Sequence, residues 1–149
     1  MILHKSVSLW VVLIFTIFLA ACAQKPAGPV EIESSDMCSY CRMAISEQRY
    51  AAEFIDRQGE VYKFDDLGCM KKFFHTKHLG QEGGIFYAVE YESKQWLPAQ
   101  LASFVQSDQF KTPMSGGIVA IREKTRAEQL ARENQGIVMT FDDIFGMGK

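Results

Sequence analysis

The chain has 149 residues, of which 48% are hydrophobic, 12% aromatic and 23% charged, with a formal net charge of −2. This composition is typical of one or two small globular domains, and it excludes an intrinsically disordered chain and a collagen-like fibre. The slightly acidic balance offers no basic field, so we expect no nucleic-acid partner. Four cysteines are too few for a disulfide-rich miniprotein, so their positions matter more than their number.

The N-terminal segment has the features of a bacterial export signal. A short basic start precedes the apolar run Leu9–Leu19, which is too short to span a bilayer as a permanent helix. The sequence Leu-Ala-Ala-Cys follows and resembles a lipobox, in which the cysteine is acylated after cleavage. We therefore expect residues 1–21 to be a lipoprotein signal peptide. Acylated Cys22 would anchor the protein in a membrane of the cell envelope, facing the periplasm or the exterior. The alternative is an ordinary signal peptide or anchor with an incidental cysteine.

The segment after Cys22 is predicted to be a tether. Residues 22–35 contain two prolines and a glycine and show little periodicity, so we expect them to hold a domain of residues 36–149 away from the membrane. With Cys22 lipidated, three cysteines remain in that domain: Cys38, Cys41 and Cys69. An odd number of cysteines outside the cytosol leaves at least one thiol without an internal partner.

The domain is predicted to alternate short strands and helices. In the first part of the domain the hydrophobic pattern predicts a strand over 50–56, a hairpin turn over 57–59, a strand over 61–64, a helix over 67–78 and a strand over 84–91. A short strand at 96–97 and a helix over 99–105 are expected next. The last part is predicted to contain a loop over 112–117, a strand over 118–122, a helix over 125–134 and a strand over 137–141. The pairs Asp65–Asp66 and Asp142–Asp143 are typical of helix N-caps, the second for a last short helical turn.

Part of the sequence is repeated. Gln58–Met70 and Gln135–Met147 agree at seven of thirteen positions, with an offset of 77 residues. Each copy reads as a turn, a strand, an Asp-Asp pair and a helix start, which favours an internal duplication with pseudo-repeats at about 38–92 and 112–149. The alternative is convergence on a common strand-to-helix turn. If the halves are related, Met43 and Met114 each precede the first strand of a half, which predicts that both lie near the junction.

Sulfur-containing side chains gather at three places. Cys38 and Cys41 form a C-x-x-C pair with Met43 two positions further on, Cys69 opens a predicted helix, and Met114 lies in a glycine-containing loop. Thiolates and thioethers are soft donors suited to Cu(I), and thioether ligands favour Cu(I) over Zn(II) because they add no charge.

Several other interpretations of these residues remain open. A closed zinc site needs four ligands, so three cysteines would have to recruit His75 or His78, which are otherwise surface residues of the predicted helix. Cys38 and Cys41 are also compatible with a disulfide or a thiol redox pair. Cys69 is compatible with a buried inert thiol. The methionines are compatible with core packing; these are Met43, Met70 and Met114.

Four segments together resemble the NosL family of copper lipoproteins. They are the lipobox at Cys22 and the runs CSYCRMAISEQRYAAEFID, VYKFDDLGCMKKFF and TPMSGGIVAI. The resemblance implies an α+β fold of two homologous small halves of ββαβ type. It also implies binding of Cu(I) by cysteine and methionine, and delivery of copper, together with an ABC-type transporter, to the copper centres of nitrous oxide reductase.

By this resemblance Cys41 and Met43 stand in the C-G-M segment of the family, and Met114 stands in its P-M loop. Arg42 replaces the commoner glycine, and Cys38 and Cys69 are further candidate ligands. We therefore expect a monomeric, membrane-tethered Cu(I) metallochaperone rather than an enzyme. The alternative is an extracytoplasmic binding module stapled by zinc or a disulfide, without a role in copper delivery.

Overall fold

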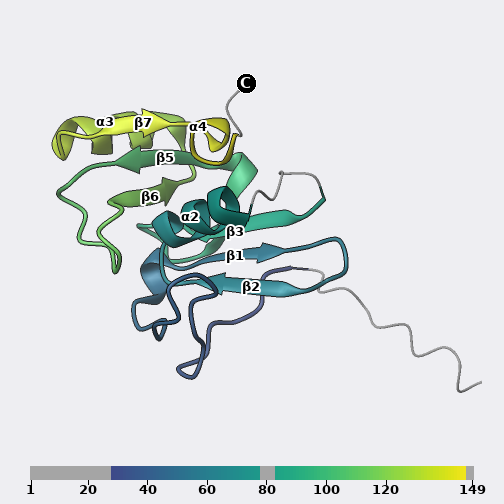
Figure 1. Cartoon of the computed structure of the whole chain (residues 1–149). Coiled ribbons are helices and arrows are strands. Elements are labelled where there is room, and N and C mark those ends of the chain that lie inside the picture. The colour runs from purple at the N-terminus through teal and green to yellow at the C-terminus, as the bar shows by residue number, and fades with distance from the viewer. Residues whose placement is uncertain (1–27, 78–82, 147–149) are drawn as a thin grey trace, which may run out of the picture.

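The computed structural model describes residues 28–77 and 83–146, which form two antiparallel sheets and their helices (Figure 1). The first sheet has the strand order β2-β1-β3-β4 and comprises β1 (Ala52–Ile55), β2 (Val61–Phe64), β3 (Ile85–Val89) and β4 (Trp96–Pro98). The second has the order β6-β5-β7 and comprises β5 (Ser103–Gln106), β6 (Ile118–Ile121) and β7 (Ile137–Met139). The helices are α2 (Leu67–Lys77), α3 (Lys124–Glu133), α4 (Phe141–Phe145) and the short 3-10 turns η2 (Gln48–Tyr50) and η3 (Ala99–Leu101).

The two halves have the same topology. One runs β1-β2-α2-β3 and the other β5-β6-α3-β7, and the first strand of each half is flanked by the other two strands. This confirms the predicted α+β fold with two ββαβ halves. The structural halves and the sequence repeat align different elements. In the structure β2 and α2 correspond to β6 and α3, whereas the sequence repeat aligns β2 and α2 with β7 and α4. The second half begins at Ser103, before the expected boundary at 112, and the repeated sequence marks a recurring strand-to-helix turn.

The predicted helix over 99–105 is wrong. Only η3 is helical, and Ser103–Gln106 is the strand β5, which pairs with both β6 and β7. Phe104 and Val105 are fully buried at the centre of this sheet. Pairing on both edges outweighs the local helix propensity of alanine, leucine and glutamine in this segment.

The other predicted helices and strands are found, with ends that differ by at most two residues. The helix α2 packs its apolar face on the first sheet, as its spacing predicted: Leu67, Met70, Phe73 and Phe74 are all buried. Phe74 lies at the centre of an aromatic cluster, with ring centroids 4.7 Å from those of both Phe54 on β1 and Phe86 on β3. Aromatic pairs at this separation add about 1 kcal/mol each to the burial of their surface.

The helix α4 joins the two halves. Its residues Phe141 and Phe145 pack on Phe86, with ring centroids 5.1 and 5.2 Å apart. The N-cap of α4 is Thr140, and Asp143 closes a capping box with it. The Asp142–Asp143 pair, predicted to be the N-cap, therefore lies in the first turn of α4, and the cap is two residues before Asp142. The same hydrophobic core continues from the first sheet into the second.

The expected tether is partly a structured segment of the domain. Ile32 is buried in the main core, and the Val30 N–H donates to the Glu53 carboxylate at 2.9 and 3.2 Å. Glu53 is fully buried on β1 and points away from α2, because adjacent residues of a strand face opposite sides. Residues from Val30 onward thus cover the face of the first sheet opposite α2. The expected signal peptide, Cys22 and the start of the tether lie outside the described residues.

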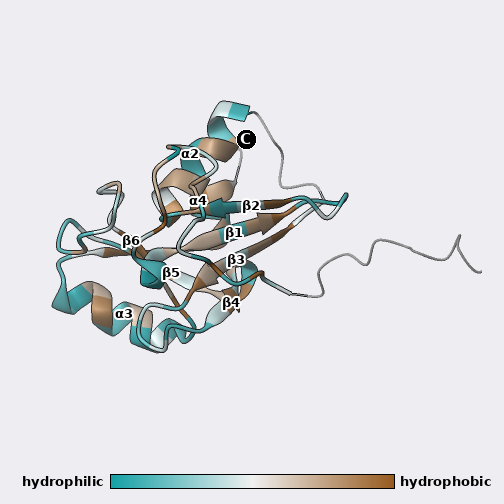
Figure 2. Cartoon of the chain, turned by 90° about the horizontal axis from the view of Figure 1, so that it is seen from below, coloured by the Kyte–Doolittle hydropathy of each residue, from teal (hydrophilic) through white to brown (hydrophobic). Residues whose placement is uncertain are grey.

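The helix α3 covers a second, smaller core. Its buried residues are Ala127, Leu130 and Ala131, which pack with Val105 and Ile121. In Figure 2 hydrophilic and hydrophobic residues alternate along α3, as in an amphipathic helix with one exposed face.

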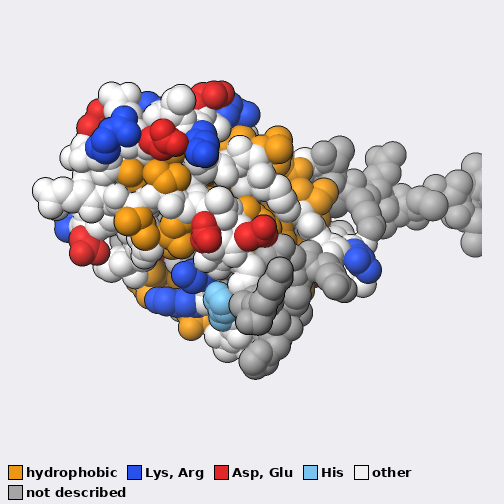
Figure 3. Space-filling model, turned by 90° about the horizontal axis from the view of Figure 1, so that it is seen from above, with side chains coloured by type: hydrophobic (Ala, Val, Ile, Leu, Met, Phe, Trp, Pro, Cys, Tyr) orange, Lys and Arg blue, Asp and Glu red, His pale blue; other side chains and the backbone are white. Residues whose placement is uncertain are grey.

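In Figure 3 acidic and basic side chains are interspersed on the upper face, with hydrophobic side chains between them. No helix within residues 28–77 and 83–146 is long and apolar enough to cross a membrane.

Candidate metal centre

A tight turn brings the two sulfurs of the C-x-x-C pair together. In this turn, residues 38–43, here called the cysteine loop, the Cys38 N–H donates to the Met43 carbonyl at 2.8 Å. The Arg42 N–H donates to the Cys38 carbonyl at 3.0 Å. The Ser39 N–H donates to the Lys63 carbonyl at 2.8 Å, which fixes the cysteine loop to the edge of β2.

The cysteine loop contains a residue in the left-handed region. Arg42 has φ 64°, a conformation that glycine adopts without steric penalty and that L-residues adopt at a cost of about 1–2 kcal/mol. This explains why a glycine suits the position between Cys41 and Met43. This chain adopts the turn with arginine at that position.

Three cysteines and one aspartate form the candidate metal centre. The ligand atoms of Cys38, Cys41, Asp65 and Cys69 all lie within 4.8 Å of one another. Cys38 and Cys69 are fully buried, whereas Cys41 is partly exposed. All three cysteines are free thiols, so the structure contains no disulfide between Cys38 and Cys41. The Cys41 thiol donates to Asp65 Oδ2 at 3.3 Å.

The start of α2 positions Cys69 and Asp65. Asp66 caps the helix by accepting from the Cys69 N–H at 2.7 Å, as the sequence predicted for this pair. The Asp66 N–H donates to Asp65 Oδ1 at 2.9 Å, which orients the Asp65 carboxylate. Of the two aspartates, Asp66 is therefore the cap and Asp65 faces the thiols.

Asp66 also ties the two halves together at this centre. Its second oxygen, Oδ2, accepts from the Met114 N–H at 3.0 Å. Met114 is partly buried against the main core, and the prediction that it lies near the junction is confirmed. Met43 lies at the end of the cysteine loop with 58% of its surface exposed. Met70 is fully buried, so it is a core residue.

Burial sets the protonation of the thiols. It raises the pKa of Cys41 to about 11, against a smaller lowering by a hydrogen bond from the Met43 backbone. Burial raises the pKa of Cys69 further, and the Asp65 carboxylate beside it acts in the same direction. Both groups are therefore neutral thiols at neutral pH in the metal-free protein. Because metals bind the thiolate, any metal that binds here displaces protons.

The sequence interpretation missed Asp65. A zinc site was expected to require His75 or His78, but His75 is exposed on α2 and His78 lies outside the described residues. One aspartate is enough to cap a helix, so the second aspartate of an Asp-Asp pair is free for another role. That second carboxylate was the sequence feature that indicated Asp65. The resulting donor set has three soft sulfurs suited to Cu(I) and one hard oxygen, and its four ligands also satisfy the count for Zn(II).

Comparison with known proteins agrees with the predicted fold. The solved structure of the copper chaperone NosL from Shewanella denitrificans superposes with a TM-score of 0.72 at 20% identity, covering 83% of this chain and 99% of that chain. This likeness shows a shared fold. No curated protein sequence matches. The sequence model of the NosL family matches residues 29–146, most of the chain and all four residues of the cluster. The chain therefore belongs to the NosL family.

Proposed function

We propose that this protein binds Cu(I) and passes it to a copper-dependent partner, as a carrier rather than an enzyme. The observation that carries the proposal is the gathering of three thiols within 4.8 Å beside two loops that each contain a methionine. Soft, low-charge ligand sets favour Cu(I). The family membership and the description of the Shewanella protein as a copper chaperone support the same role.

The gradient of exposure suggests how copper enters and leaves. Cys41 is the one thiol of the three with exposed surface, and Met43 beside it is 58% exposed. We assign Cu(I) to Cys41, Met43 and Met114, with the buried thiols of Cys38 and Cys69 as further ligands. A partner that presents sulfur ligands would displace Met43 first, because a neutral thioether on a solvent-exposed side chain is the ligand most readily exchanged.

Asp65 has a defined part in this exchange. When Cu(I) binds, Cys41 must lose its proton, and its thiol already donates to Asp65 Oδ2. The carboxylate accepts that proton, and the return of the proton to sulfur assists release of the metal. Asp65 thus couples copper transfer to proton transfer without being a copper ligand.

The location and the recipient are parts of the same proposal. Acylation of Cys22 would hold the protein at a membrane of the cell envelope, facing the periplasm or the exterior. An ABC-type transporter and nitrous oxide reductase would be its copper partners, as the family resemblance implies. A copper-free reductase incubated with the Cu(I)-loaded protein would then regain its copper centres and its activity, and protein loaded with no metal would leave it inactive.

The binding step is tested by anaerobic competition with a chromophoric Cu(I) chelator under reducing conditions. Wild-type protein is expected to withdraw Cu(I) from the chelator. Cys41→Ser and Met114→Leu are expected to weaken binding at least about tenfold, since each removes a sulfur ligand. Met139→Leu, on β7, is the matched control and should bind as wild type does. Failure of wild-type protein to compete would refute the proposal.

A structural zinc site is the second candidate, and the four-ligand count of the cluster favours it. Cys38 and Cys69 are fully buried, as ligands of a closed structural site are. In that case isolated protein would contain stoichiometric zinc, and chelation would unfold it. Metal analysis of the purified protein, followed by circular dichroism before and after a chelator is added, distinguishes this role from copper exchange.

A further inference from the structure

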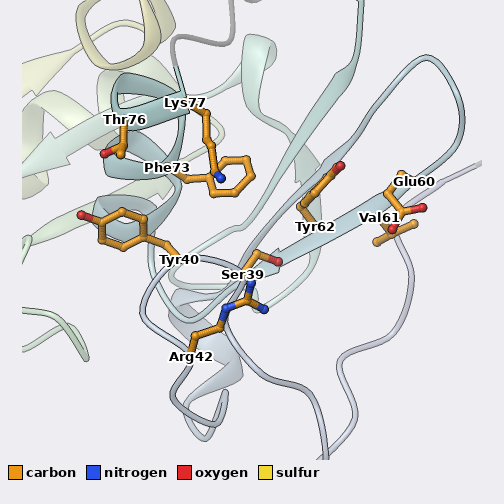
Figure 4. Close-up of a pocket in the computed structure, with 9 residues that line it drawn as sticks. All are labelled: Ser39, Tyr40, Arg42, Glu60, Val61, Tyr62, Phe73, Thr76 and Lys77. Carbon is orange, nitrogen blue, oxygen red and sulfur yellow. The ribbon is translucent and has the colours of Figure 1, made fainter.

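A groove of about 720 Å³ lies beside the cysteine loop, and none of the candidate metal ligands lines it (Figure 4). One wall comes from the cysteine loop, one from β2 and one from the C-terminal end of α2. Three aromatic side chains are among the residues that line it: Tyr40, Tyr62 and Phe73. The groove is therefore open to solvent along the edge of the first sheet.

The edge of β2 is open where it borders this groove. The Glu60 carbonyl accepts from Asp56 on the β1 side, and the Lys63 carbonyl accepts from Ser39 on the outer side. Backbone groups along a strand alternate in direction, so Val61 also turns its N–H and carbonyl outward. Among the described residues no group bonds to these two atoms of Val61. An unpaired strand edge is a template for another extended chain.

The charges along the groove indicate what that chain carries. Arg42 on the cysteine loop and Lys77 on α2 both line it, and Figure 4 shows them on the side away from Glu60. The groove thus has two cations toward one end and one carboxylate at the other. An occupant complementary to this pattern has acidic residues at the Arg42 end.

We propose that this groove binds an extended, acidic segment of a partner protein, which adds to the first sheet as a strand beside β2. Backbone hydrogen bonds to Val61 would provide the register, and alternate side chains of the segment would pack on Tyr62 and Phe73. Arg42 and Lys77 would hold its acidic residues. The bound segment passes directly beside the cysteine loop, so that its neighbouring residues reach Cys41 and Met43.

That this partner exchanges copper rests on the function proposed above, whereas recognition of the segment does not. A protein that binds copper weakly would still bind the peptide, and a protein without the groove would still bind copper. The two functions are therefore separable by experiment.

The test is selection from a library of random linear twelve-residue peptides displayed on phage, with the full-length protein in detergent as bait. The selected peptides are expected to be extended sequences with apolar residues at alternate positions and with Asp or Glu toward one end. One selected peptide is then synthesised with a fluorophore, and its affinity is measured by fluorescence polarisation.

Two variants that leave every candidate metal ligand in place locate the binding site. Val61→Pro removes the outward N–H at an edge position that tolerates proline, and Lys77→Glu reverses one charge of the groove. Each is expected to weaken peptide binding about tenfold. Lys72→Glu, an exposed residue of the same helix outside the groove, is the matched control and should leave affinity unchanged.

The outcomes separate the two proposals. The proposal that the groove binds a peptide segment would be refuted if no peptide is selected, or if both groove variants leave peptide affinity unchanged. If Val61→Pro fails to fold by circular dichroism, Lys77→Glu decides alone. A Cu(I) competition on each variant should match wild type. Peptide binding without copper binding in wild-type protein would refute the copper proposal and retain the groove.

Discussion

Gly68 on α2 and Gly116 in the loop after Met114 lie in direct backbone contact. A β-carbon on Gly116 would lie 3.2 Å from the Gly68 α-carbon, and one on Gly68 would lie 3.3 Å from the Gly116 α-carbon. Both distances are shorter than ordinary van der Waals contact. The absence of both side chains lets the second half bring Met114 against the start of the helix that contains Cys69.

Replacement of Gly116 by alanine tests this contact. Gly116→Ala forces the loop and the helix apart by a few tenths of an ångström, because the neighbouring atom is backbone and does not rotate away. We expect a loss of about 1 kcal/mol of unfolding free energy. Cu(I) affinity, measured by competition with a chelator, should also fall. Gly28→Ala is the control, since nothing lies within 4 Å of a β-carbon there. Equal copper affinity in both variants would contradict the role assigned to the contact.

Asp66 holds the same junction through hydrogen bonds. Asp66→Ala removes the α2 cap and leaves the Met114 N–H without its acceptor, so we expect a loss of about 2 kcal/mol in urea unfolding. Asp66→Asn keeps one acceptor oxygen and should fall between wild type and alanine. The matched control is Asp142→Ala, an exposed residue in the first turn of α4. It should change stability by less than about 0.5 kcal/mol. A similar loss in both alanine variants would contradict this prediction.

Much of the fold follows from local pattern. The strand β2 and the helix α2 have the predicted position because hydrophobic alternation and helical spacing are strong there and an aspartate cap separates them. The strand β5 was missed because its conformation depends on pairing with β6 and β7, which come later in the chain. The cover formed by Ile32 was missed for a similar reason, since a proline-containing segment gives no periodic signal.

The sequence predicted which cysteines belong to the candidate site, but it did not predict the full set of side chains that meet there. The spacing of Cys38 and Cys41 predicted that they act together, and the structure adds Cys69 to them. The role of Asp65 was missed because it depends on where the cysteine loop lies, and that position is set by the hydrogen bond from Ser39 to Lys63 on β2. Contacts between residues far apart in the chain carry no local sequence signature.

Arg42 offers a test of strain in the cysteine loop. At φ 64° a β-carbon is unfavourable, so Arg42→Gly should be more stable than Arg42→Ala by about 1 kcal/mol. Both variants lose the same charge, so the comparison isolates the backbone. The measurement is urea unfolding of reduced, metal-free protein. Equal stability of the two variants would show that the turn imposes no such penalty.

Glu53 makes stability depend on pH. Burial raises the pKa of this carboxyl above its ordinary value, against smaller opposing effects of the Val30 hydrogen bond and of Lys63. The folded protein therefore holds the proton more tightly than the unfolded chain does. Its contribution to stability is full below the ordinary pKa and is lost as pH rises through the folded pKa.

Glu53→Gln keeps an oxygen that can accept from Val30 and removes the charge that burial disfavours. We expect this variant to exceed wild type in unfolding free energy at pH 7.5 and to match it near pH 4. Cys41 does not confound the comparison, because its pKa of about 11 lies above this range. Glu33→Gln, an exposed residue of the same N-terminal segment, should follow wild type throughout. If Glu53→Gln is less stable than wild type at pH 7.5, the ionised carboxylate stabilises the docked segment more than its burial destabilises it.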